Sequence, residues 1–283
     1  RSTLFPYTTL FRSVQCGLVL NNEISNVATA LRQSNKWENE YEEPLEEALL
    51  GDFFSLQQKV LYMRQWEVVD PYEYVAPFLD TIRSDKVGAS VTSIALAGLW
   101  KLLTCNVVPA SHHNSAQTLK HIVAALEGCQ FQTATNSAHE ALITRLVQVL
   151  SACVCSDVGV LLSADDVMLV TMNIWKWCEF SPTSESMMKI SPIFIQSVQQ
   201  SLQQLISCLF SRLRTCRVFL DEIAMPGELQ DNTSDMTGPK SDCLFTPGGV
   251  PFNLSDDAMV ANLCCGLEPF HDILMYCTEP MRI

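Results

Sequence analysis

The stretch VGASVTSIALAGLWKLLTC, residues 87–105, decides the fold. Lys101 is its only charged residue, and its apolar residues fall on nearly every side of a helix rather than along a single stripe. These apolar residues include Val91, Ile94, Ala95, Leu96, Leu99, Leu102 and Leu103. Because such a helix must be covered on both sides, the sequence predicts that it lies inside a larger helical stack.

The segments on both sides of this stretch also carry helical periodicity. Upstream, residues 45–63 place apolar side chains at steps of three and four only, which forms a stripe along one helix face. Asp70 and Pro71 mark the start of a short helix that precedes the apolar one. The later helical segments are residues 116–128, 137–155, 163–180 and 191–214. Because no convincing stretch alternates with a period of two, the sequence predicts an all-α fold, an armadillo-like α-solenoid of paired antiparallel helices.

The composition limits the class of protein. A hydrophobic content of 48% in 283 residues is enough to bury a continuous core. The net charge of −13 would repel phosphate backbones, so we expect no nucleic-acid partner. The 12 cysteines lie in apolar, helix-period stretches, which favours reduced, buried thiols over a disulfide framework. The most apolar window, residues 93–110, is too short and too interrupted to span a bilayer, so we expect a cytosolic protein.

The chain divides into four parts by sequence character. Residues 1–13, RSTLFPYTTLFRS, resemble translated sequencing-adapter sequence, and we expect them to be non-native. Residues 14–216 hold the predicted helices. Residues 217–262 contain several prolines and glycines and the polar run QDNTSDMTGPKSD, which is typical of a linker. Residues 263–283 carry a last helical patch, which we expect to begin another domain of a longer protein.

Patterns typical of catalysis or metal binding are missing from the sequence. The phosphate-binding G-x-x-x-x-G-K-[ST] and G-x-G-x-x-G motifs, H-E-x-x-H and G-x-S-x-G do not occur. His112 and His113 are adjacent and would lie on different faces of any helix, which favours a surface loop over a zinc site. We therefore expect no catalytic residue, no cofactor and no metal ligand.

Two cysteines and a serine lie in LSACVCSDVGVLLSADDV, residues 150–167. Cys153 and Cys155 have no second cysteine pair at zinc-ribbon distance, and they end a predicted helix, where the dipole favours the thiol over the thiolate. Ser163 and the aspartate three residues later have the spacing of a capping box. The stretch is interpreted as a helix end, a turn at residues 156–159 and a capped helix start.

Several blocks together resemble one family. YVAPFLDTIRSDKVGASVTSIALAGLWKLL, residues 74–103, resembles the helix pair near the start of the large Golgi-type Arf guanine-nucleotide exchange factors. That group includes the Golgi brefeldin-A-resistance factor and plant GNOM. The block ALITRLVQVLSACVCSDVGVLLSADDV, residues 141–167, resembles a later helix, turn and helix start of the family, and SLQQLISCLFSRL, residues 201–213, resembles its helix ending in L-F-S-R-L. The order and spacing agree over roughly residues 14–216.

The resemblance implies a regulatory role. This region of the family is the dimerisation and cyclophilin-binding (DCB) domain, so residues 14–216 are expected to be DCB-like, and GLEPFHDILMY resembles the opening of the homology domain that follows. The implied partners are a second copy of the chain, that downstream homology domain, cyclophilin and, indirectly, the Golgi membrane. The exchange reaction belongs to a Sec-seven-type domain that no stretch here resembles. We therefore expect a non-catalytic module, cytosolic and peripheral at Golgi membranes, that reaches Arf only through a catalytic domain outside this chain.

Three tryptophans are the candidate protein-interaction residues. Trp100, Trp175 and Trp177 are the large side chains of the predicted helices at residues 74–103 and 163–180. Burial in the core is the alternative for each of them. Two other functions stay open at this point. One is a generic armadillo-like adaptor unrelated to Arf exchange, and the other is an enzyme using Cys153, Cys155 and the histidines.

Overall fold

The computed structural model describes residues 5–34, 44–62, 69–129, 135–178, 191–224, 243–245 and 251–253. Most of these residues are helical. The helices are α1 (Phe5–Ser34), α2 (Pro44–Tyr62), α3 (Pro71–Arg83), α4 (Ala89–Thr104), α5 (Ser115–Glu127), α6 (Asn136–Cys155), α7 (Ala164–Cys178) and α8 (Pro192–Ala224). A short 3-10 helix, η1 (Asp157–Leu161), joins α6 to α7. Two short strands, β1 (Cys243–Phe245) and β2 (Pro251–Asn253), pair antiparallel.

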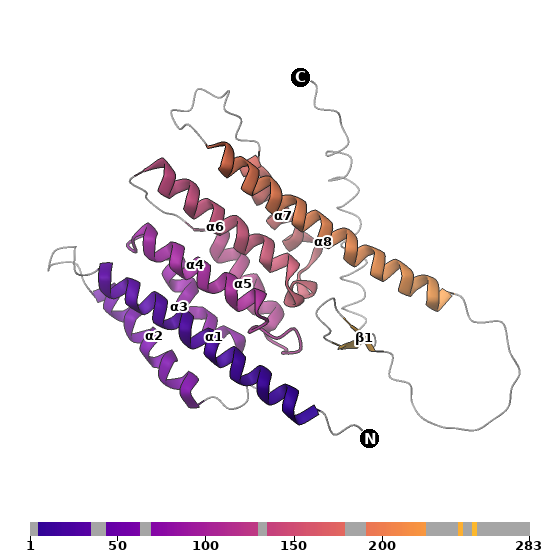
Figure 1. Ribbon diagram of the computed structural model, residues 1–283, viewed down its shortest axis with the longest axis horizontal. Helices are drawn as coiled ribbons and strands as arrows, with labels where there is room; N and C mark the ends of the chain where they lie inside the picture. The colour runs from indigo at the N-terminus through magenta and orange to yellow at the C-terminus, as the bar shows by residue number, and fades with distance from the viewer. Residues whose placement is uncertain are drawn as a thin grey trace, which may run out of the picture.

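The helices pack in two layers. In the first layer α1 packs on α4, α4 on α6 and α6 on α8, and Figure 1 shows these helices as successive oblique rows. In the second layer α2 packs on α3, α3 on α5 and α5 on α7. The layers are joined because α1 packs on α2, α3 on α4, α5 on α6 and α7 on α8. The predicted all-α solenoid of paired helices is confirmed for this stack.

Neighbouring helices of the first layer are held at both ends. At the start of α6, Glu140 accepts hydrogen bonds from the backbone N–H of Ser191, at 2.7 Å, and from the Ser191 hydroxyl, just before α8. At the other end, Arg212 of α8 donates to the carbonyl oxygen of Ser156 at 2.9 Å. Like ends therefore meet, so α6 and α8 run parallel, as expected when successive helix pairs stack in a solenoid.

The helix that decides the fold is buried as its sequence predicts. Leu96, Leu99, Leu102 and Leu103 of α4 are fully buried. Gly98 lets α3 approach α4 closely, because a Cβ atom at Gly98 would lie 2.9 Å from Cε1 of Phe78. Phe78 in turn meets Phe53 of α2 edge to face, with ring centroids 5.1 Å apart. The close packing at Gly98 therefore joins three helices.

The predicted helix starts are observed. Asp70 is the N-cap of α3 and accepts from the backbone N–H of Tyr72 at 3.0 Å, with Pro71 at the first helical position. At α7, the backbone N–H of Asp166 donates to Oγ of Ser163, and the backbone N–H of Ser163 donates to the Asp166 carboxylate, each at 3.3 Å. These reciprocal bonds are a capping box with aspartate in place of the usual glutamate.

The connection between α6 and α7 differs from the predicted turn at residues 156–159. It is the 3-10 helix Asp157–Leu161, which begins one residue after the predicted turn begins. Gly159 sits against the end of α6, where any Cβ atom would collide with the carbonyl oxygen of Val154. The extra turn keeps Val158 and Leu162 buried, which the local sequence alone does not reveal.

Two predicted boundaries also differ from the helices. α1 begins at Phe5, inside the segment 1–13, and α8 continues to Ala224, beyond residue 216. α8 continues because RVFLDEIA contains no proline or glycine, and the first proline after it is Pro226. The strands β1 and β2 lie within residues 217–262 and are too short to show a period of two. The division into domains stays a prediction, and residues 263–283 lie outside the described part of the chain.

One described helix, α6, is long and apolar enough at Ser137–Cys155 to cross a membrane by length and composition. It packs between α4 and α8 in the first layer, with α5 and α7 against it from the second. Its residues Leu142, Ile143, Val147 and Leu150 are buried there. These contacts are those of a core helix, because the apolar surface is already covered by protein.

Candidate functional site

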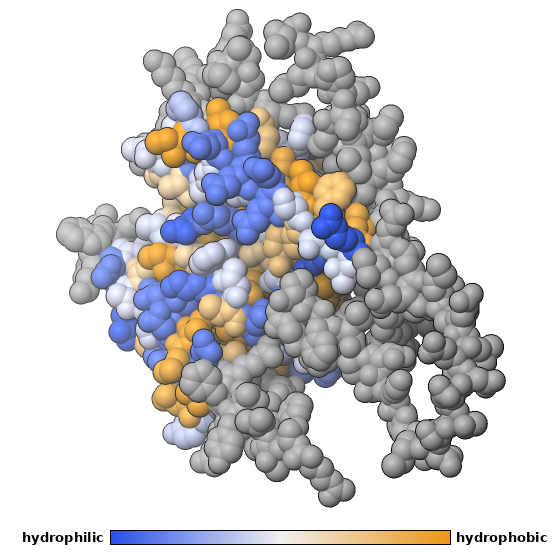
Figure 2. All heavy atoms as spheres, turned by 45° about the vertical axis from the view of Figure 1, so that its right-hand side comes forward, coloured by the Kyte–Doolittle hydropathy of each residue, from blue (hydrophilic) through white to orange (hydrophobic). Residues whose placement is uncertain are grey.

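The exposed face of the first layer is hollowed between α4, α6 and α8. This recess has a volume of about 420 Å³, and we call it the amide groove. Its lining residues are Trp100, Thr104, Asn106, Gln148, Ser151, Ala152, Cys155, Ser156, Asp157, Ser197, Gln200, Ser201 and Gln204. In Figure 2 hydrophilic residues gather through the middle of the visible face, with hydrophobic residues between them.

The amide groove is rich in uncharged polar groups. Gln148, Gln200 and Gln204 carry amides that both donate and accept hydrogen bonds, and four serines supply hydroxyl groups. Asp157 is the one carboxylate in the lining, and it accepts from Nδ2 of Asn106 at 2.6 Å. Such a surface suits binding of a polar polypeptide segment better than acid–base chemistry, which needs titratable groups facing a substrate.

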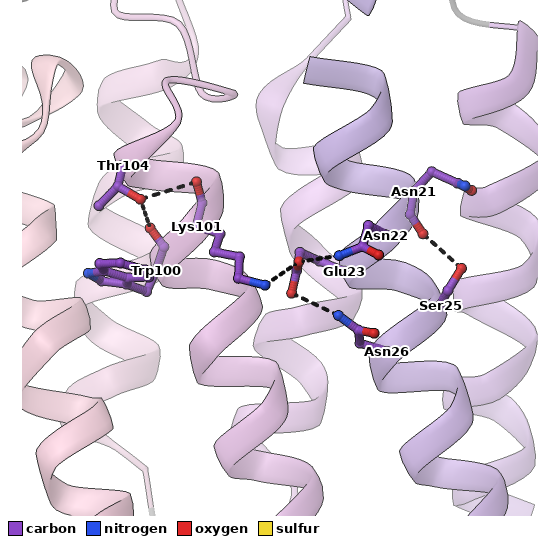
Figure 3. Close-up of polar contacts among 8 residues, drawn as sticks. All are labelled: Asn21, Asn22, Glu23, Ser25, Asn26, Trp100, Lys101 and Thr104. Carbon is purple, nitrogen blue, oxygen red and sulfur yellow. Dashed lines mark hydrogen bonds and ion pairs between the residues drawn. The ribbon is translucent and has the colours of Figure 1, made fainter. Parts of the chain in front are cut away.

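Trp100 is the large apolar side chain at this groove. Its exposed fraction is 36%, while Leu99 and Leu102 beside it in the sequence are fully buried. Figure 3 shows its indole directed away from α1, beside Thr104 on the same helix. An exposed tryptophan within a polar groove is typical of a residue that contacts a protein partner.

A second recess adjoins the amide groove on the same face. It lies between α1, α4 and α6 and has a volume of about 430 Å³. Nζ of Lys101 lies 2.6 Å from Oε1 of Glu23, whose carboxylate also accepts from Asn22 at 2.8 Å and Asn26 at 3.3 Å (Figure 3). Only 3% of the Glu23 side chain is exposed. Its charge is therefore compensated by three donors from two helices.

Arg145 connects the two recesses. It lines the second recess and donates from one guanidinium nitrogen to Oε1 of Gln148 in the amide groove at 3.1 Å. Sequence reasoning missed both the Glu23 ion pair and this link. No local pattern could have revealed the ion pair, because its partners are 78 positions apart in the chain.

The predicted tryptophan candidates are not brought together. Trp175 and Trp177 lie on α7, in the second layer, where both are partly buried and pack against the core. Trp100 lies on α4, in the first layer. Trp175 and Trp177 therefore pack mainly against the core. Of the three tryptophans, Trp100 is the one that lines the groove. A role of the three in protein contacts stays a prediction.

The histidine pair lies in the connection between α4 and α5, as expected of a surface loop. His113 is exposed, and Nδ1 of the partly buried His112 accepts from the backbone N–H of Asn114 at 3.1 Å. The described residues contain no group of three or more histidine, cysteine or acidic side chains placed to hold a metal ion.

The cysteines of the 150–167 stretch have the predicted protonation but an unpredicted neighbour. Burial raises the pKa of Cys153 to about 12. The pKa of Cys155 is also raised, because its thiol hydrogen bonds to Cys208 of α8 and is partly desolvated. The interaction with Cys155, helped by the nearby Arg212 guanidinium, lowers the pKa of Cys208 from its usual value. Cys208 was not a candidate from sequence, because it stands alone within a regular helical stretch.

Comparison with curated proteins gives consistent relatives. The ARF guanine-nucleotide exchange factor GNL1 of Arabidopsis thaliana is 30% identical over 200 residues, which are 69% of this chain and 13% of that protein. The ARF guanine-nucleotide exchange factor GNOM of the same plant is 28% identical over 213 residues, 74% of this chain and 14% of that protein. ARF guanine-nucleotide exchange factor 1 of Saccharomyces cerevisiae is 22% identical over 187 residues, 65% of this chain and 13% of that protein.

This chain belongs to the family of large Arf guanine-nucleotide exchange factors. No protein-family model matches it. The family resemblance read from the three sequence blocks is confirmed, and an adaptor unrelated to the Arf exchange factors is disfavoured. The chain spans only 13–14% of the length of its plant exchange-factor relatives GNL1 and GNOM.

Proposed function

We propose that the chain is a non-catalytic regulatory and dimerisation module of a large Arf exchange factor acting in Golgi vesicle traffic. One observation carries the proposal. The chain is related to Arf exchange factors over most of its length, yet it corresponds to about an eighth of theirs. A two-layer helical stack with an extended exposed face is suited to holding protein partners rather than to transforming a substrate.

The amide groove is the surface we assign to protein contacts in this proposal. Trp100 supplies a large amphipathic side chain, and the surrounding amides and hydroxyls supply hydrogen bonds that do not depend on partner charge. Its partners would be a second copy of the chain and the homology domain downstream. Cyclophilin is a further proposed partner. The longer exchange factor to which the module belongs would place it in the cytosol and at Golgi membranes. The module would reach Arf only through the catalytic domain of that longer protein.

Self-association is the direct test. Multi-angle light scattering on the purified 283-residue chain, over a concentration series from nanomolar to high micromolar, should show a dimer mass that dissociates on dilution. A monomer mass at every concentration would contradict the dimerisation part of the proposal. Titration with the separately purified homology domain of a related exchange factor then tests the second partner.

Absence of exchange activity is tested separately. Arf loaded with a fluorescent GDP analogue is mixed with the chain and excess GTP, and the release rate is compared with Arf alone. We expect no acceleration, whereas an active exchange factor of the family serves as the positive control. Acceleration that scales with the concentration of the chain would contradict the non-catalytic assignment, independently of the light-scattering result.

A further inference from the structure

The amide groove is hollow because α6 carries small side chains where it passes between α4 and α8 (Figure 1). Ser151 and Ala152 of α6 form its floor and are buried. Trp100 of α4 stands on one side, and a stripe of α8 stands on the other. The lining extends over residues 148–156 of α6 and 197–204 of α8, so the groove runs along the helices.

The α8 side of the groove presents two amides that the chain itself does not use. Gln200 and Gln204 are exposed, line the groove and lie about one helical turn apart. No hydrogen bond within the described part of the chain involves either amide. Each amide carries both donors and an acceptor at its tip. This side of the groove can therefore bond to groups that themselves donate and accept, such as a polypeptide backbone.

The charge of the lining favours an uncharged occupant. Among the described residues that line the groove, Asp157 is the only charged one, and it already accepts from Nδ2 of Asn106 at 2.6 Å. A charged side chain that entered the groove would lose hydration without gaining an unpaired opposite charge. A neutral polar group would instead exchange its hydrogen bonds with water for hydrogen bonds with the lining amides and hydroxyls.

The spacing of the two amides matches an extended polypeptide. Residues four positions apart in an α-helix are separated by about 6 Å along its axis. Alternate residues of an extended chain are about 6.6 Å apart, and their backbone N–H and C=O groups point to the same edge. Gln200 and Gln204 can therefore each bond to one residue of such a chain, with the two bonded residues two positions apart.

A helical partner does not fit this lining. The backbone groups of an α-helix already bond to one another, so a docked helix depends on an apolar face that enters an apolar groove. Here the least polar lining side chains are Trp100, Ala152 and Cys155, and the others carry amide, hydroxyl or carboxylate groups. An extended segment gains more from this lining, because its backbone groups are unpaired.

We propose that the amide groove binds an extended, uncharged polypeptide segment of a partner protein. Gln200 and Gln204 hold the segment through its backbone, and Trp100 packs against one large apolar side chain. The α8 lining from residue 197 to 204 is about 10 Å long, which accommodates roughly three extended residues. The inference rests on the proposed protein-contact role of the groove and adds the conformation and polarity that a partner must present.

Selection from a random peptide library tests the proposal. Phage carrying random linear peptides are panned on the immobilised 283-residue chain, and enriched peptides are synthesised and measured by fluorescence anisotropy. The double variant Gln200→Ala, Gln204→Ala removes the groove amides. The matched control is Gln199→Ala, Gln203→Ala, which removes two exposed amides of the same helix that do not line the groove. We expect the dissociation constant to rise about tenfold or more in the first variant and less than about twofold in the control.

Backbone methylation of a selected peptide tests its conformation. A methyl group placed on one peptide nitrogen at a time removes one backbone donor. We expect binding to be lost when either of two residues, two positions apart, is methylated, because those residues face the α8 amides. Methylation of the residue between them should leave most of the binding intact, because its backbone groups point to the opposite edge.

Three results would overturn the inference. They are failure of every enriched peptide to bind in synthesised form, equal weakening by the two double variants, and methylation losses that do not alternate, as a helical peptide would give. Urea unfolding of both double variants checks that they are folded. The light-scattering result is independent, because peptide binding does not require a dimer. A dimer without peptide binding would overturn this inference alone, and a monomer that binds peptide would overturn only the dimerisation.

Discussion

Glu23 of α1 and Lys101 of α4 form an ion pair of 2.6 Å in which only one partner is buried. The side chain of Glu23 is 3% exposed and that of Lys101 is 41% exposed. Two asparagine amides complete the environment of the carboxylate. The pair therefore fixes α1 to α4 through a carboxylate that is almost fully buried, while the lysine remains partly hydrated.

Replacing Lys101 by methionine should destabilise the chain by about 1–3 kcal/mol, because it leaves the buried Glu23 charge with neutral donors only. Urea unfolding followed by circular dichroism measures the change. The matched control is Lys59→Met, whose ion pair with Glu73 is longer, at 3.6 Å, and more than half exposed on both sides. That variant should lose less than about 1 kcal/mol. Equal losses in the two variants would show that the burial of Glu23 is not the deciding factor.

Glycine substitutions test the close approach of α3 to α4. Gly98→Ala should lower stability by about 1–3 kcal/mol, because the new Cβ atom would lie 2.9 Å from the ring of Phe78 and 3.4 Å from the Cβ atom of Glu23. Gly51→Ala in α2 is the control, because no atom lies within 4 Å of its Cβ position. It should raise stability by roughly 0.5–1 kcal/mol. Stabilisation by both alanines, seen in thermal unfolding, would contradict this packing.

The capping box at the start of α7 gives a third prediction. Ser163→Ala removes the acceptor for the backbone N–H of Asp166 and should cost about 1 kcal/mol. Ser201→Ala is a control within α8, where the hydroxyl only bonds back to the carbonyl oxygen of Ser197. Alanine there should be close to neutral, since mid-helix serine competes with the backbone for hydrogen bonds. The midpoints of denaturant unfolding give the two losses of stability, provided that both variants unfold with the same dependence on denaturant concentration. A larger loss of stability for Ser201→Ala than for Ser163→Ala would argue against the cap.

The amide groove is tested through self-association. Trp100→Ala should raise the dimer dissociation constant about tenfold or more, because a large exposed anchor is removed from the proposed interface. Tyr72→Ala is the matched control, since Tyr72 has nearly the same exposed fraction, 37% against 36%, but lies on α3 of the second layer. Analytical ultracentrifugation of both variants gives the constants. A larger effect at Tyr72 would place the contact surface on the other layer.

The helical character of the chain was accessible from sequence because its signals are local. The apolar residues of α4 predicted a helix covered on both sides, and they are buried. Asp70 with Pro71, and Ser163 with Asp166, predicted two helix starts that the structure confirms. A cap or an apolar period involves residues a few positions apart, so neighbouring side chains alone specify it.

The features that the sequence left undecided were those that depend on what lies next to a segment in space. The residue 156–159 turn became a 3-10 helix because Val158 and Leu162 have to reach the core, and Gly159 has to fit against Val154. The three tryptophans looked equivalent in sequence. Packing then separated them, because α4 presents Trp100 to the groove while α7 turns Trp175 and Trp177 against the core.

The sequence by itself determined the helices, their starts and the family, because periodicity, capping and the order of similar blocks are written along the chain. Only the tertiary structure decided the Glu23–Lys101 pair and the amide groove. These features join residues from different helices. Their geometry depends on how the two packed layers bring residues from distant positions in the chain together. The spacing of residues along the chain does not specify that packing.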